Sequence, residues 1–383
     1  MNIAVGTWLH IYTHYCTTPS QEPGQCILIT GCPTLLSLLQ NRSRSKSQTE
    51  FLRDSQCGAP PKSVERPTAP PVTYRPLYPQ RPTPPRTSNS CTAADVVNVD
   101  HLLPNPNECG EEAGEDRIVG GEATNIDQYP WMALVEYKNS RGSISLGCGA
   151  TLISKRYVIT AGHCVFGAVL TQLGTPINIR LGEYDKSTLI DCVQVPGGQD
   201  CNEEPVTIGI EEIISHPDYQ PSRGTEMNDI AVIRLANDAP YTDFIRPICL
   251  PKSDITTQAN VSSIVAGWGA TESEKSSNVK LHLQVPLVSL AICQAAYMNP
   301  KTPRLHARLW DKQLCAGGQP GKDSCRGDSG GPLMVVEDTK VPVQWTLHGV
   351  VSFGPTPCAL PNMPGVYSKV FSYLNWIKAQ IRE

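Results

Sequence analysis

Fifteen cysteines constrain this chain more than any other feature of its sequence. None stands in a C-x-x-C pair, so the spacing does not suggest a zinc or dithiol redox site. The count indicates disulfide bonds formed in an oxidising compartment. Because fifteen is odd, at least one thiol is unpaired or bonded to another chain. We therefore expect an extracellular, disulfide-bonded protein.

Charge and hydropathy exclude two kinds of partner. The formal net charge of -4 does not suggest nucleic-acid binding. No apolar run approaches the ~20 residues that a bilayer-spanning helix needs, so no membrane partner is expected. The first residues lack a basic start, and His10 and His14 interrupt their short apolar stretch. No signal peptide is therefore evident in this sequence.

Composition divides the chain into four parts. Residues 1–15 are left unassigned, and residues 16–57 carry four closely spaced cysteines that predict a small disulfide-rich module. Residues 58–117 form a linker and activation segment, of which positions 58–90 contain ten prolines and should be extended. The remaining residues, 118–383, have the composition of a globular domain.

Short β-rich runs separated by turns fill residues 118–383. Three of them are YVIT at 157–160, IAVIRL at 230–235 and LHGVVSF at 347–353. Many short strands over such a length favour an all-β fold of antiparallel barrels. Only the C-terminal end has apolar residues at helical spacing, which predicts a final helix. Those residues are Tyr373, Trp376, Ile377 and Ile381.

Three separated motifs suggest nucleophilic catalysis. GKDSCRGDSGGP at 321–332 surrounds Ser329 with glycines, which marks backbone that turns sharply or approaches another group closely. TAGHC contains His163, and NDIAVIRL opens with Asp229. A serine hydroxyl is a weak nucleophile until an adjacent base accepts its proton. A histidine can be that base, and a buried carboxylate can fix its tautomer.

These motifs resemble the chymotrypsin family of serine proteases. The matching words are RIVGG, WMALV, TAGHC, NDIAVIRL, AGWG, GDSGGP and PGVYSKV, and the resemblance covers residues 118–383. The resemblance implies a double six-stranded antiparallel β-barrel with the site between the barrels. It also implies that His163 is the base, Asp229 the orienting acid and Ser329 the nucleophile.

The resemblance further implies roles for groups around Ser329. The backbone N–H groups of Gly327 and Ser329 would bind the developing oxyanion. Asp323 would lie at the floor of the primary specificity pocket and favour Arg or Lys in the substrate. Gly354 and Gly365 would form pocket walls without side chains.

The word DRIVGG implies a zymogen. Cleavage after Arg117 would free the α-amine of Ile118, which would pair with Asp328 and order the oxyanion loop. Acidic residues at 111, 112, 115 and 116 crowd this segment. They are either a solvated acidic run or a means of discouraging self-cleavage at Arg117.

Disulfide pairs are also implied by the resemblance, as is an attachment between the two parts of the cleaved chain. Cys109 should join Cys249 and keep the N-terminal part attached after activation. The other pairs are Cys148–Cys164, Cys192–Cys201, Cys293–Cys315 and Cys325–Cys358.

The N-terminal words CTTPSQEPGQC, GCPTLLSLLQ and FLRDSQCG resemble the arthropod clip domain. With the protease domain, they make the chain similar to clip-domain serine proteases of the prophenoloxidase-activating and Easter-like kinds. Such domains have six cysteines, whereas this chain has four before the proline-rich segment. Cys26 and Cys57 can still pair, and Cys16, Cys32 and Cys91 are left without assigned partners.

Smaller motifs suggest modification and a metal. Asn41 in NRS and Asn260 in NVS are N-glycosylation acceptors by pattern. Glu183 and Asp185 offer oxygen ligands that suit calcium, which family members often bind in this loop. The alternative for these two acids is simple solvation, and no cofactor is required for the expected reaction.

The sequence as a whole predicts a secreted, trypsin-like endopeptidase zymogen of the haemolymph. Its expected partners are protein substrates in a proteolytic cascade, an upstream activating protease and serpin-type inhibitors. The alternative is a catalytically idle clip-domain homologue that acts as a cofactor or scaffold. Such homologues usually replace the nucleophile, and the presence of Ser329 favours the enzyme.

Overall fold

The computed structural model describes most of the chain from residue 99 onward. The described residues are 15–17, 23–25, 99–112, 123–195, 198–221, 226–257, 261–270, 276–299, 307–320, 327–337, 343–355, 358 and 360–383. The chain divides into two compact units, Met1–Val96 and Val97–Glu383. In the first unit the structure describes a short antiparallel pair, β1 (Tyr15–Thr17) and β2 (Pro23–Gln25), in which Cys16 lies opposite Gly24.

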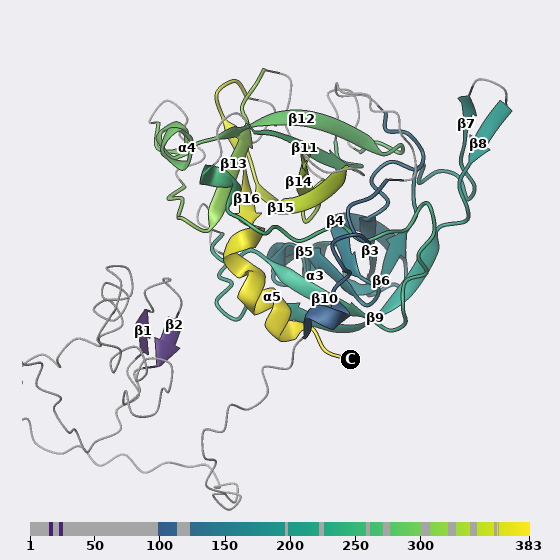
Figure 1. Cartoon of the computed structure of the whole chain (residues 1–383), viewed down its shortest axis with the longest axis horizontal. Helices are drawn as coiled ribbons and strands as arrows, with labels where there is room; N and C mark the ends of the chain where they lie inside the picture. The colour runs from purple at the N-terminus through teal and green to yellow at the C-terminus, as the bar shows by residue number, and fades with distance from the viewer. Residues whose placement is uncertain are drawn as a thin grey trace, which may run out of the picture. The chain divides into compact units, whose positions relative to one another are not determined.

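Two closed six-stranded antiparallel barrels form the second unit (Figure 1). The first barrel has the strand order β10-β5-β4-β3-β6-β9, and the second has the order β11-β12-β13-β16-β15-β14. The first contains β3 (Met132–Lys138), β4 (Ile144–Ser154), β5 (Tyr157–Thr160), β6 (Thr175–Leu181), β9 (Val206–Ser215) and β10 (Ala231–Leu235). The second contains β11 (Ser262–Gly267), β12 (Leu281–Val288), β13 (Gln313–Gly317), β14 (Pro332–Glu337), β15 (Gln344–Phe353) and β16 (Pro364–Lys369).

Closure explains why the strands are so apolar. Each residue of β10 is buried, although its side chains alternate between the two faces of the sheet. A closed barrel has no exposed edge, and its inner face is filled by side chains. The outer face of this strand is covered as well, so the sequence shows a nearly continuous apolar run rather than an alternating one.

Aromatic residues join the two barrels. Tyr129 meets Trp345 edge to face, with ring centroids 5.3 Å apart, and Trp131 lies 6.3 Å from the same ring. The indole N–H of Trp131 donates to Sδ of Met334 on β14 at 2.9 Å. Such pairs add stability beyond the burial of their area. They hold the first barrel against the second, and the candidate site lies where these barrels meet.

Helices are few and short. The C-terminal helix predicted from the sequence is present as η5 (Val370–Tyr373) followed by α5 (Leu374–Gln380). The expectation that only the chain end is helical was too narrow, because Ser289 caps a second helix by accepting from the N–H of Ile292. That second helix is α4 (Leu290–Tyr297). The further helical segments among the described residues are α3 (Ala168–Gln172), η2 (Val99–Leu102), η3 (Gly162–Cys164) and η4 (Ile255–Thr257).

A disulfide-closed hairpin projects from the first barrel (Figure 1). It consists of β7 (Cys192–Val195) and β8 (Gly198–Cys201), whose ends are joined by the Cys192–Cys201 bond. Among the described residues, no helix is long and apolar enough to cross a membrane.

Candidate active site

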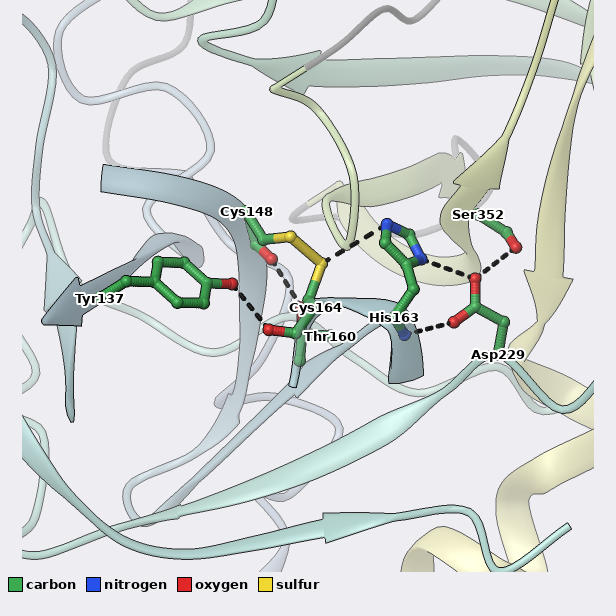
Figure 2. Close-up of a disulfide and its surroundings, with 8 residues drawn as sticks. Tyr137, Cys148, Thr160, His163, Cys164, Asp229 and Ser352 are labelled. Atoms are coloured by element: carbon green, nitrogen blue, oxygen red, sulfur yellow. Dashed lines mark hydrogen bonds and ion pairs between the residues drawn. A yellow bond between two sulfur atoms is a disulfide. The ribbon is translucent and has the colours of Figure 1, made fainter. Parts of the chain in front are cut away.

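A short turn after β5 carries the predicted base. His163 lies in η3, and the next residue, Cys164, is joined to Cys148 on β4 by a disulfide. The hydroxyl of Tyr137 donates to the carbonyl of Cys164 at 2.8 Å (Figure 2). These two attachments fix the turn on the barrel while the His163 side chain stays 29% exposed.

Asp229 precedes β10 and is completely buried. One carboxylate oxygen accepts from Nδ1 of His163 at 2.8 Å, and the other accepts from the backbone N–H of His163, also at 2.8 Å (Figure 2). The Ser352 hydroxyl, at the end of β15, donates to the same carboxylate at 2.5 Å. The carboxylate is therefore oriented by groups from both barrels, and it fixes the tautomer of His163 with the proton on Nδ1.

Burial and charge act in opposite directions on this pair. Burial alone would raise the pKa of Asp229, but the charge and hydrogen bonds of His163 and the Ser352 hydroxyl outweigh it and lower that pKa. Burial alone would lower the pKa of His163, whereas Asp229 and, more weakly, Glu226 raise it. His163 is thus a stronger base than an ordinary histidine, as acceptance of a serine proton requires.

Ser329 lies on a tight turn beside the histidine segment. Its carbonyl accepts from the N–H of Gly149 on β4 at 2.8 Å. The next residue, Gly330, has φ +78°, and a Cβ there would lie 2.2 Å from Oγ1 of Thr160, near the end of β5. The glycine therefore permits a close approach between the serine turn and the turn that carries His163.

The predicted oxyanion residue also needs glycine geometry. Gly327 has φ +103°, and a Cβ there would lie 2.9 Å from the Cα of Gly269. Between Gly327 and Ser329, a carboxylate oxygen of Asp328 accepts from the N–H of Gly269 at 2.8 Å. The turn is thus packed against the segment that follows β11, which limits where its N–H groups can point.

The two residues predicted to form pocket walls lie side by side, on paired strand segments. A Cβ built on Gly354, just after β15, would lie 3.9 Å from the Cα of Gly365 on β16. Because neither residue has a side chain, no side chain projects from this part of the predicted pocket wall.

Several predicted residues lie outside the described part of the chain. They are Arg117 and Ile118 of the activation site with Glu115 and Asp116 before it, Asp323, Asn41 and Asn260, and the cysteines Cys26, Cys32, Cys57, Cys91 and Cys325. Cys358 is disulfide-bonded, and its expected partner is Cys325. Four predicted pairs are disulfides in the structure: Cys109–Cys249, Cys148–Cys164, Cys192–Cys201 and Cys293–Cys315.

One cluster with metal-ligand spacing is explained by covalent chemistry. Cys148, Cys164 and His163 bring their ligand atoms within 4.8 Å of one another. Both sulfurs belong to one disulfide, so neither is the thiolate that a metal would need. The cluster is the disulfide beside the base rather than a metal site.

The two residues predicted to bind calcium sit in a loop with a third acid. Glu183 accepts from Nη1 of Arg180 at 3.0 Å, and Asp185 accepts from the N–H of Ser187 at 2.9 Å. Asp191, which is buried, accepts from the N–H of Asp185 at 2.9 Å. The oxygen donors suit a hard cation, and one of them already has a guanidinium partner.

The acidic run before the activation site is not uniformly solvated. The Glu112 carboxylate accepts from the N–H of Tyr129 at 3.2 Å, and burial raises its pKa to about 7. Burial lowers the pKa of Lys280, whose charge acts on Glu112, to about 8. Glu111 lies 3.9 Å from Arg246. Glu111 and Glu112 therefore contact other residues of the protease unit. The interpretation of this segment as a solvated acidic run did not predict these contacts.

Sequence reasoning missed the residues that support the catalytic pair. Ser352 and Ser368 both donate to Asp229, the first to its carboxylate and the second to its carbonyl at 2.6 Å. Tyr219 and Glu226 lie on the loop that leads to Asp229. Ser352 is separated from Asp229 by 123 positions, and no local pattern indicates that pairing.

The fold and this constellation define a trypsin-like serine endopeptidase, and comparisons with known proteins agree. The family profile Trypsin matches residues 118–377, and the profile of the regulatory CLIP domain of proteinases matches residues 16–68. Serine protease ea of Drosophila melanogaster is 43% identical over 373 residues, covering 96% of this chain and 90% of the relative. Phenoloxidase-activating enzyme of Bombyx mori is 42% identical over 381 residues, covering 96% of this chain and 82% of the relative.

A solved structure is similar along nearly the full length. It is that of the Drosophila Grass clip serine protease of the Toll pathway, with 30% identity and a TM-score of 0.65. The match covers 97% of this chain and 98% of the other. The chain belongs to the clip-domain serine proteases.

Proposed function

We propose that this endopeptidase is a secreted zymogen that acts in an extracellular proteolytic cascade of innate immunity. Cleavage between Arg117 and Ile118 activates it, and the new α-amine then pairs with Asp328. His163, Asp229 and Ser329 act as base, orienting acid and nucleophile. The N–H groups of Gly327 and Ser329 bind the oxyanion.

The substrate residue before the cut bond is Arg or Lys. The observation that carries this proposal is the adjacent placement of Gly354 and Gly365, two wall residues without side chains, where a Cβ on the first would lie 3.9 Å from the Cα of the second. Asp323, six positions before the nucleophile, supplies the negative charge that pairs with the substrate cation. The cleaved chain should therefore hydrolyse arginyl amides at least a hundred-fold faster than phenylalanyl amides.

The measurement compares kcat/KM for matched peptide amides that differ only in the residue before the bond. Equal or faster hydrolysis of the phenylalanyl amide would contradict the assigned specificity. The same enzyme is then incubated with candidate haemolymph proenzymes, and the new N-termini are sequenced. Cuts after Arg or Lys at one site of a proenzyme identify the substrate.

The partners are protein substrates of the cascade, an upstream activating protease and serpin-type inhibitors. The names of the relatives indicate two settings, phenoloxidase activation and the Toll pathway. The two corresponding alternatives for the substrate are a prophenoloxidase and a Toll-ligand precursor. The disulfides Cys192–Cys201 and Cys109–Cys249 fit the oxidising environment outside the cell.

Calcium in the loop of Glu183 and Asp185 is the remaining element of the proposal. Burial raises the pKa of Glu183, and the charge of Asp191 adds to this effect. A bound cation would offset the negative charge that Asp191 adds beside Glu183. Removing calcium with EDTA should lower the melting temperature by about 5 °C, because the folded state loses its bound ligand. Thermal unfolding with EDTA, and with calcium restored, measures this shift, and an unchanged melting temperature rejects the site.

A further inference from the structure

The chain segment that precedes the activation site is packed on the protease unit. Residues 99–112, here called the pre-activation segment, belong to the same compact unit as the two barrels, which begins at Val97. The segment opens with η2, and Leu102 and Leu103 pack against the hydrophobic core. These contacts all lie before Arg117, so cleavage after that residue does not break any of them.

Gly110 is hydrogen-bonded to the protease unit on both sides of its backbone. Its N–H donates to the carbonyl of Pro247 at 2.8 Å, and its carbonyl accepts from the N–H of Trp345 on β15, also at 2.8 Å. Gly110 has φ +70°, and a Cβ there would lie 2.2 Å from the carbonyl oxygen of Trp345. Glycine is therefore required for this close approach of two backbones.

Side chains extend the contact to both barrels. The amide of Gln344, the first residue of β15, donates to the carbonyls of Pro106 and Cys109, the second at 3.3 Å. Glu112 is half-buried, and its carboxylate accepts from the N–H of Tyr129, shortly before β3, at 3.2 Å. The pre-activation segment thus contacts β15 of the second barrel and the start of the first.

The surroundings of Glu112 link this contact to proton uptake. Burial raises the pKa of Glu112 to about 7; Asp127 also raises it, whereas hydrogen bonds from Tyr129 and Trp345 and the charge of Lys280 lower it. In a released segment the carboxyl has its ordinary pKa of 4.5. Binding of the segment therefore takes up a proton between these two values, so it becomes tighter as pH falls through 7. Lys280, whose pKa burial lowers to about 8, adds little to this change below pH 7.

We propose that the pre-activation segment binds the two barrels non-covalently, strongly enough to hold the N-terminal part of the chain without the Cys109–Cys249 disulfide. The inference extends the proposed activation, because the cut at Arg117 is what divides the chain. The cleaved protease therefore keeps its N-terminal part as a bound subunit, also under conditions that reduce disulfides. The partner that fits this surface is the chain's own segment, fixed in place by Gly110 and Glu112.

The test uses the full chain with a cut that does not depend on the natural activator. Residues 113–117 are replaced by Asp-Asp-Asp-Asp-Lys, after which enteropeptidase cleaves before Ile118. Cys109→Ala and Cys249→Ala remove the covalent link, and the melting temperature of the uncut variant checks that it folds. Sedimentation velocity at roughly 1 μM should show most of the cut chain as one complex, which requires a dissociation constant below about 0.5 μM.

Substitutions in the segment separate specific binding from general stability. Gly110→Ala should weaken binding at least about ten-fold, because a Cβ does not fit beside the Trp345 carbonyl. Glu112→Ala should weaken it about ten-fold, because the buried N–H of Tyr129 loses its acceptor. Asn105→Ala is the matched control: Asn105 is exposed, and its side chain donates to Glu108 within the same segment. This control should stay within about two-fold of the parent chain.

A pH series measures the role of Glu112 independently of stability. The parent chain should bind the segment about five- to ten-fold more tightly at about pH 6 than at about pH 8, as expected when one carboxyl changes its pKa on binding. Glu112→Gln keeps an oxygen acceptor but cannot titrate, so its binding should be nearly equal at the two pH values. An unchanged pH dependence in Glu112→Gln would contradict the role given to this carboxyl.

Hydrogen exchange gives a measurement that needs no cysteine substitution. In the enteropeptidase-cut chain with its disulfide intact, the amides of Gly110 and Trp345 should stay as protected as in the uncut chain. Separation of the folded, cut, disulfide-free chain would overturn the inference. If that variant does not fold, loss of protection in the disulfide-bonded chain overturns it instead. A cut chain that keeps its N-terminal part but hydrolyses no arginyl amide would overturn the proposed function and leave this inference standing.

Discussion

Replacing Asp229 by Asn should lower kcat of the activated enzyme about 10⁴-fold. The carboxylate accepts from Nδ1 of His163 at 2.8 Å and so places the imidazole proton on that nitrogen. An amide at this position can present N–H to Nδ1 and thereby favour the tautomer that carries its proton on Nε2. In that tautomer His163 cannot accept the proton of Ser329.

The measurement is kcat for an arginyl amide between about pH 6 and pH 10, together with the melting temperature. Asp238→Asn, at an exposed position 3.8 Å from Arg156, is the control and should leave kcat unchanged. Asp229→Asn should also remove the negative charge that raises the pKa of His163, so the remaining activity of this variant should persist to lower pH. A loss of less than ten-fold in kcat would show that Asp229 does not orient the base.

Arg117→Gln should keep the chain inactive after treatment with a trypsin-like activating protease. Without the cut, no α-amine forms at residue 118, so the ion pair with Asp328 that is proposed to order the oxyanion turn does not form. Loss of one member of a buried ion pair costs about 3–5 kcal/mol, which corresponds to roughly 10²- to 4 × 10³-fold in the population of the ordered turn. The activity of the variant should fall by about that factor relative to the cleaved wild-type chain.

Strands and the catalytic motifs were the most predictable parts of this molecule. YVIT at 157–160 and LHGVVSF at 347–353 lie in β5 and β15, because short β-branched and aromatic runs bounded by turns fit a pleated buried surface. The predicted pair of six-stranded barrels is confirmed. Their closure followed from the family resemblance, since periodicity alone does not say which strands are neighbours.

Contacts between distant segments were not predictable from local pattern. Ser352 donates to Asp229 across 123 positions, and a serine at the end of an apolar strand gives no sign of this role. Glu112 was included in an acidic run that could be solvated, yet it is half-buried and accepts from the N–H of Tyr129. A carboxylate with a raised pKa cannot be recognised before its surroundings are known.

The N-terminal module shows a different limit. Four cysteines in residues 16–57 are fewer than a complete clip domain has, and the sequence does not say how an incomplete set pairs. The profile of that domain nevertheless matches residues 16–68. The boundaries between module, linker and protease domain stay predictions from composition and resemblance.

Labelling with a serine-reactive fluorophosphonate tests the central claim most directly. Wild-type and Arg117→Gln chains are labelled before and after treatment with the activating protease, and the modified peptide is identified by mass spectrometry. Strong labelling of Ser329 is expected only in the wild-type chain cut after Arg117. Equal labelling of the uncut chain, or a label on another residue, would contradict it.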